Sequence, residues 1–210
     1  MTALAFSARA VATAEPVILN AGCGASGAER LPRLFGAWRH VRIDVDPAVQ
    51  PDVVADLTDL SAFADTSADA IWTAHCMEHL YRHQVTQALG EIRRVLKADG
   101  FAVIIVPDVQ RIARYVVEDR MSEPIYESPA GPITAHDILF GHGRSIADGN
   151  FHMAHRTGFT PSSLTECVRE AGFPACVIRR RPQFELIAVA RKTPWPDPAQ
   201  MQALIAALGA

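Results

Sequence analysis

Short apolar runs alternate with stretches of helical period along the chain, as in a parallel sheet covered on both faces. The predicted strands are residues 17–20, 40–44, 53–55, 70–73, 102–106, 175–180 and 185–190. The predicted helices are residues 28–34 with an interruption, 84–96, and 161–171 with Thr160 as N-cap. The last two strands are joined by too few residues for a crossover helix and should pair antiparallel. The pattern predicts an α/β fold: a doubly wound, mostly parallel seven-stranded sheet with a C-terminal antiparallel hairpin.

The pattern also divides the chain. We expect residues 1–15 to be a flexible tail, residues 16–193 to be one domain, and residues 194–210 to be a helical extension. Within the domain, residues 109–158 fit neither period, are rich in Gly, Pro and His, and are long for a connection. Such insertions after a strand's carboxyl end often carry substrate-binding elements, so we predict a substrate-binding or lid role for this one.

Composition limits the class of protein. The chain has 210 residues, 49% of them hydrophobic, and a formal net charge of −3, which favours one soluble domain without a large nucleic-acid footprint. No apolar run approaches the roughly 20 residues that cross a bilayer, so no membrane insertion is expected. The four cysteines lack metal-ligand spacing, which favours a reducing, cytoplasmic setting.

An apolar strand at residues 17–20 leads directly into a glycine-rich turn. Gly22 and Gly24 permit backbone angles closed to other residues, and Asp44 follows about one strand–helix–strand unit later. This arrangement is typical of a nucleotide-like cofactor site, although an ordinary tight turn also fits. Together with Gly27 the turn matches the dinucleotide fingerprint of dehydrogenases, but Pro32 follows too soon for the long helix which that motif opens.

Further along the chain, a series of segments resembles a known family in order and spacing. The segments are residues 18–24, 42–47, 53–57, 74–80, 94–100, 105–108 and 155–160. They resemble class I, Rossmann-like S-adenosylmethionine-dependent methyltransferases, specifically the type 11-like branch whose first motif reads Leu-Asn-x-Gly-x-Gly. The resemblance spans about residues 17–192 and implies S-adenosyl-L-methionine as cofactor.

The resemblance also implies a set of cofactor contacts. Asp44 would bind the ribose hydroxyls, with Asp46 as a competitor, and Asp56 would face the adenine unless it only forms a turn with Thr58. Most of the larger family carries an acidic residue where this chain has Asn20, so the ammonium contact lacks a charge here. The implied cofactor-binding residues are Asn20, Ala21, Gly22, Cys23, Gly24, Asp44, Val45, Asp56, Leu57, Ala74 and His75.

The candidate catalytic residues are two histidines. His75 follows the fourth strand, where an unperturbed pKa would suit a base near neutral pH, and His155 lies in a matched His-x-x-Gly-Phe segment. A helix beginning near His75 would place His79 and His83 on the same face, but the His-Glu-x-x-His spacing is missing and no metal is expected. Glu78 and His79 match a Glu-His pair for which we expect a structural hydrogen-bonding role.

Two missing motifs limit the classes of methyl acceptor that the sequence favours. After the fourth strand there is no Asn-Pro-Pro-aromatic clamp of amino-methylating enzymes, and no acidic cluster of the magnesium-dependent catechol type is visible. The resemblance favours O-methylation of a small molecule or saccharide. Two alternatives stay open: an inactive cofactor-binding partner subunit, and an NAD(P)-dependent oxidoreductase. A homodimer is also compatible with the sequence.

Overall fold

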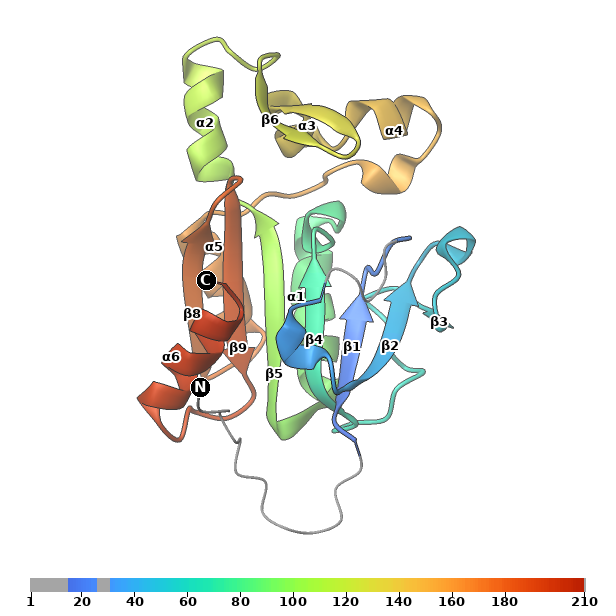
Figure 1. The fold of residues 1–210 in the computed structure, drawn as a ribbon, viewed down its shortest axis with the longest axis vertical. Coiled ribbons are helices and arrows are strands. Elements are labelled where there is room, and N and C mark those ends of the chain that lie inside the picture. Colours follow the sequence, from blue (N-terminus) through green and yellow to red (C-terminus); the bar gives the residue numbers. More distant parts are fainter. Residues whose placement is uncertain (1–14, 26–30, 210) are drawn as a thin grey trace.

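A seven-stranded sheet forms the body of the molecule, which a computed structural model describes for residues 15–25 and 31–209 (Figure 1). Its strands are β1 (Val17–Ala21), β2 (Arg39–Asp44), β3 (Val53–Val54), β4 (Ala68–Ala74), β5 (Leu96–Pro107), β8 (Ala175–Arg181) and β9 (Glu185–Arg191). They lie in the order β3-β2-β1-β4-β5-β9-β8. The first five are parallel, whereas β9 runs antiparallel to both β5 and β8. The predicted fold class is confirmed.

Helices cover both faces of this sheet (Figure 1). Alternate residues of the buried strands point to opposite faces, so Leu19 packs with α1 (Arg82–Val95) and α5 (Pro161–Glu170), and Ile18 packs on the other side. There the cover is the 3-10 turn η2 (Arg33–Phe35) and α6 (Pro198–Ala207). No helix within residues 15–25 and 31–209 has the length and apolar character to span a bilayer.

Two of the three predicted helices are present with small changes at their ends. The side-chain oxygen of Thr160 accepts a hydrogen bond from the Ser163 amide at 3.2 Å, so this residue is the expected N-cap of α5. Helix α1 begins at Arg82, two residues before the prediction, and ends where β5 begins at Leu96. Of the predicted helix 28–34, residues 28–30 lie outside the described part, and the rest holds only η2. The predicted tail also lies outside it, except for Glu15.

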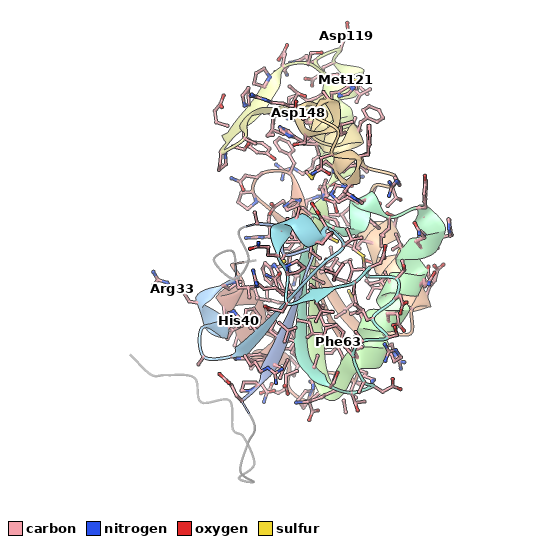
Figure 2. All side chains as sticks on the ribbon, turned by 90° about the vertical axis from the view of Figure 1, so that its right-hand side faces the viewer. Arg33, His40, Phe63, Asp119, Met121 and Asp148 are labelled. Atoms are coloured by element: carbon pink, nitrogen blue, oxygen red, sulfur yellow. The ribbon has the colours of Figure 1, made fainter. Side chains whose placement is uncertain are left out.

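The insertion folds into a small layer of its own beyond the carboxyl ends of the strands (Figure 1). It contains α2 (Val109–Val117), a hairpin of β6 (Pro124–Ser128) and β7 (Gly131–Thr134), α3 (Ala135–Phe140), α4 (Gly143–Ala147) and the turn η5 (Phe151–Met153). Four buried residues form its separate core: Ile112, Ile133, Ala135 and Ile138. Figure 2 shows Asp119, Met121 and Asp148 in this outer layer, far from Arg33, His40 and Phe63 in the body.

Asp108 fixes the start of the insertion. Its carboxylate is fully buried, accepts a hydrogen bond from Nε of Arg180 at 2.8 Å, and caps α2 through the amide of Arg111. The amide of Val109 donates to the carbonyl of Phe159 at 3.0 Å, so both ends of the insertion meet beside β5. Both ends of the insertion are therefore held at the carboxyl edge of the sheet.

Candidate active site

Gly22 and Gly24 have the left-handed backbone that the turn after β1 requires, with φ of +72° and +55°. The amides of Gly22 and Cys23 both donate to the carbonyl of Ile43, which ties the turn to β2. A Cβ on Gly22 would lie 2.8 Å from Sγ and 3.0 Å from Cβ of Cys76, whereas one on Gly24 would meet no atom of the described residues within 4 Å. The turn is therefore packed on one side and open on the other.

Asp44 ends β2 beside this turn. Its Oδ2 accepts a hydrogen bond from the Gly24 amide at 2.9 Å, and its Oδ1 accepts one from the Asp46 amide at 3.0 Å. Each carboxylate oxygen can accept a further bond, so the side chain is fixed and can still bind two hydroxyls. Asp46 instead caps the turn η3 (Pro47–Val49) through the amide of Ala48 at 2.8 Å. This geometry favours Asp44 over Asp46 as the ribose ligand.

The remaining predicted cofactor residues lie at the ends of neighbouring strands. Asn20, Ala21, Cys23 and Leu57 are buried, and Val45 is exposed. Oδ1 of Asp56 accepts hydrogen bonds from both the amide and the hydroxyl of Thr58 at 2.8 Å, which is the turn-forming role left open above.

Cys76 packs under the glycine-rich turn as a neutral thiol. Burial and the nearby carboxylate of Glu78 raise its pKa to about 12, and Asp44 and Asp56 add to the effect. The carboxylates of Asp44, Asp56 and Glu78, which lie at or just after the ends of β2, β3 and β4, therefore all lie close enough to the Cys76 thiol to raise its pKa.

His75 follows β4 with a φ of +54°. Its Nε2 lies 2.9 Å from Oε1 of Glu185 on β9, and its Nδ1 lies 3.5 Å from Oε1 of Glu78. Burial opposes the charged ring, but these two carboxylates outweigh it and raise the pKa of His75 to about 10. The expected unperturbed pKa is therefore corrected: the ring is an imidazolium at neutral pH and cannot accept a proton. A catalytic role for His75 stays a prediction.

A second group lies beside it, made of Glu78, His79 and His155. One nitrogen or oxygen from each lies within 4.8 Å of the others, and the two imidazole centroids are 4.9 Å apart. Glu78 is 1% exposed, and neither of its carboxylate oxygens has a hydrogen-bond partner among the described residues. The structural hydrogen-bonding role expected for the Glu78–His79 pair stays a prediction for the Glu78 side chain, whereas Nδ1 of His79 lies 3.1 Å from the carbonyl of Ala154. His83 belongs to α1 and stacks on Tyr81 instead of joining the group.

A cavity of about 160 Å³ lies between the carboxyl edge of the sheet and the insertion. His75, Glu78 and Glu185 line it from the sheet, and Tyr126, His142 and His155 line it from the insertion. The sequence did not identify Glu185, Tyr126 or His142 as site residues, because none of them belongs to a motif. The hairpin β6-β7, which carries Tyr126, was not expected either. A larger open hollow of about 560 Å³ lies beside α1 between Thr58 and Arg94 and contains none of the predicted site residues.

Residues 19–104 match the model of a family described as "Methyltransferase domain". The match contains the glycine-rich turn, Asp44, Asp56 and His75. Over these residues the chain is similar to a methyltransferase domain. With the sheet order above, the match supports an enzyme of the methyltransferase class with S-adenosylmethionine as its cofactor. The match thus favours this class over the oxidoreductase alternative.

Solved structures of low sequence identity share the fold of this chain. A Pyrococcus horikoshii OT3 protein has a TM-score of 0.61 at 15% identity, covering 85% of this chain and 82% of its own. An Archaeoglobus fulgidus SAM-dependent methyltransferase has a TM-score of 0.55 at 12% identity, with coverage of 84% and 86%. The 1,6-didemethyltoxoflavin-N1-methyltransferase of Burkholderia thailandensis, solved with 1,6-didemethyltoxoflavin and S-adenosylhomocysteine, has a TM-score of 0.51 at 20% identity, with coverage of 86% and 72%. No curated protein matches the chain.

Proposed function

We propose that this methyltransferase transfers a methyl group to a hydroxyl of a small molecule or saccharide bound in the cavity under the insertion. The observation that carries the proposal is the position of this cavity: His75 lines it and also follows β4, next to the turn packed on Cys76. The insertion 109–158 supplies its other wall and serves as the substrate-binding element. The small-molecule acceptor named for the Burkholderia enzyme is consistent with such a cavity.

The residues at the ends of β1 to β4 fit the cofactor. The open side of Gly24 leaves the backbone accessible, and Asp44 is held where both of its oxygens can accept ribose hydroxyls. We therefore assign cofactor binding to Asn20, Ala21, Gly22, Cys23, Gly24, Asp44, Val45, Asp56, Leu57, Ala74 and His75. When bound, the cofactor supplies a methyl group on a positively charged sulfur.

The chemistry then requires alignment and the removal of one proton. The bond between the acceptor oxygen and the methyl carbon forms as the carbon–sulfur bond breaks, and the electron pair of that bond stays on sulfur. Burial lowers the pKa of His155, and its Nδ1 lies 2.9 Å from the carbonyl of Ile138, which can only accept. Nδ1 therefore carries the proton, and Nε2 can take the hydroxyl proton. Of the two predicted histidines, His155 is the better base.

Incubation of the protein with methyl-labelled S-adenosylmethionine and a panel of sugars and phenols tests the proposal. We expect label on the oxygen of at least one acceptor, lost in His155→Asn and kept in His136→Asn, a matched change in the same insertion. Label on nitrogen or sulfur acceptors only would contradict O-methylation. Binding of the cofactor without transfer to any acceptor would favour an inactive partner subunit.

The four free thiols agree with the proposed cytoplasmic setting.

A further inference from the structure

We propose that Glu78, His79 and His155 bind one divalent transition-metal ion at the floor of the cavity. The site goes beyond methyl transfer, and no metal was expected from the sequence. Only the role assigned to the metal below rests on the proposed function; the binding itself does not.

The carboxylate of Glu78 is buried at the centre of the proposed site. It is 1% exposed and has no hydrogen-bond donor among the described residues, and the closest cationic atom recorded for it is Nδ1 of His75 at 3.5 Å. That distance is at the limit of a hydrogen bond, and His75 already makes a shorter contact with Glu185 at 2.9 Å. His75 is the cation that offsets the buried charge of Glu78, and neither carboxylate oxygen shares a lone pair with a close donor among the described residues. The carboxylate thus has the surroundings of a metal ligand.

The hydrogen bonds of His79 and His155 fix which ring nitrogen carries the proton. Nδ1 of His79 lies 3.1 Å from the carbonyl of Ala154, and Nδ1 of His155 lies 2.9 Å from that of Ile138. Carbonyl oxygens only accept, so both Nδ1 atoms carry the proton and both Nε2 atoms present a lone pair. Ligating histidines characteristically donate their second ring nitrogen to a carbonyl in this way. Each ring thus keeps one nitrogen lone pair for a metal, and one ligand atom from each of the three residues lies within 4.8 Å of the others.

Backbone hydrogen bonds hold the three residues in place. Glu78 and His79 are neighbours in the turn η4 (Met77–His79), and the Glu78 carbonyl accepts from the amides of Arg156 and Thr157 at 2.8 and 3.1 Å. The amide of His155 donates to the carbonyl of Phe140 at 3.1 Å. The return of the insertion is thus fixed on the turn that carries the other two ligands.

Close packing inside the insertion supports the same placement. Gly141 has a φ of +100°, and a Cβ there would lie 1.9 Å from the carbonyl oxygen of Met153. Only glycine allows the two limbs of the insertion to approach this closely and bring His155 over His79.

The donor set identifies the class of metal. Two imidazole nitrogens and one carboxylate suit zinc or iron(II), whereas magnesium and calcium prefer oxygen ligands. The three ligand atoms lie within 4.8 Å of one another, so one ion could bond to all three after small side-chain rotations. All three residues line the cavity, so the remaining coordination positions of the ion would be open to a molecule bound there. There a bound acceptor hydroxyl would lose its proton more easily. A bound metal would take the Nε2 lone pair of His155, so this ring could no longer accept the hydroxyl proton. The metal would instead lower the pKa of the acceptor hydroxyl.

Metal titration of the full chain after chelator treatment tests the site. Zinc affinity is measured by competition with a chromophoric chelator, and cobalt(II) is added in parallel as a spectroscopic probe. We expect one site per chain, a cobalt absorption spectrum of nitrogen and oxygen ligation, and affinities at least about tenfold weaker in Glu78→Gln and His155→Asn. His152→Asn is the matched control, since His152 lies in the same insertion, exposed and outside the group, and should bind zinc as the wild type does.

Equal zinc affinity in the wild type and Glu78→Gln, or a cobalt spectrum of sulfur ligation, would overturn the proposal. Circular dichroism of each variant checks folding, and if one variant does not fold, the cobalt spectrum of the wild type still decides. Titration with S-adenosylhomocysteine in the same samples separates this proposal from the proposed function. Unchanged S-adenosylhomocysteine binding with no metal site would contradict the metal site alone.

Discussion

Replacing Gly22 by Ala tests whether the turn after β1 is shaped by its contact with Cys76. Both Gly22 and Gly24 have positive φ, but only at Gly22 would an added Cβ overlap a neighbour, at 2.8 Å from Sγ and 3.0 Å from Cβ of Cys76. The Sγ atom can rotate away, whereas the Cβ atom is fixed to the backbone. Gly24→Ala is therefore a matched control that has the backbone cost without the overlap.

The two costs can be estimated separately. A left-handed backbone costs an alanine roughly 1–2 kcal/mol, which applies to both variants. Inserting a methyl group into a packed contact costs about 1–3 kcal/mol more, which applies to Gly22→Ala alone. We expect Gly22→Ala to lower the free energy of unfolding by about 2–5 kcal/mol and Gly24→Ala by about 1–2 kcal/mol.

Urea unfolding followed by circular dichroism measures both differences. Cys76→Ala in the Gly22→Ala background removes the Sγ overlap but keeps the Cβ overlap, so it should restore only part of the lost stability. Equal losses for Gly22→Ala and Gly24→Ala would refute the packing argument, because the backbone cost would then explain everything.

Three further predictions concern charged groups. Asp44→Asn should weaken S-adenosylhomocysteine binding about 10–100-fold in calorimetry, because charge-assisted hydrogen bonds are worth roughly 1.5–3 kcal/mol, while Asp46→Asn should change it less than about threefold. Asp108→Asn keeps the cap of α2 but removes the charge facing the half-exposed Arg180, and should cost about 1–3 kcal/mol in chemical unfolding; no loss would contradict the assigned anchor. Glu78→Gln should lower the melting temperature of the chelator-treated protein at neutral pH, since it removes a buried carboxylate that faces the His75 imidazolium at 3.5 Å, and an unchanged melting temperature would show that Glu185 alone holds this charge.

The sheet could be predicted because its signals are local. Most strands contain an apolar run, such as residues 17–19 of β1, and their parallel direction follows from connections long enough for a crossover. Asp44 could be placed because it follows the glycine-rich turn by about one strand–helix–strand unit and lies in the matched segment 42–47.

The chemistry of the site could not be predicted, because it depends on residues far apart in the chain. His75 is protonated through Glu185, which is 110 positions away, and no motif links them. Glu78 and His155 meet only because the insertion returns over η4. The insertion was located from the sequence, but its helices and hairpin were not predicted, because the helices are short and its core has only four buried residues, too few to give a clear period.

Calorimetric titration with S-adenosylhomocysteine, beside NAD and NADP in the same buffer, tests the central claim most directly. We expect one molecule of S-adenosylhomocysteine bound per chain, no binding of either dinucleotide, and much weaker binding of S-adenosylhomocysteine in Asp44→Asn. Binding of a dinucleotide alone, or an affinity for S-adenosylhomocysteine that Asp44→Asn leaves unchanged, would contradict this claim.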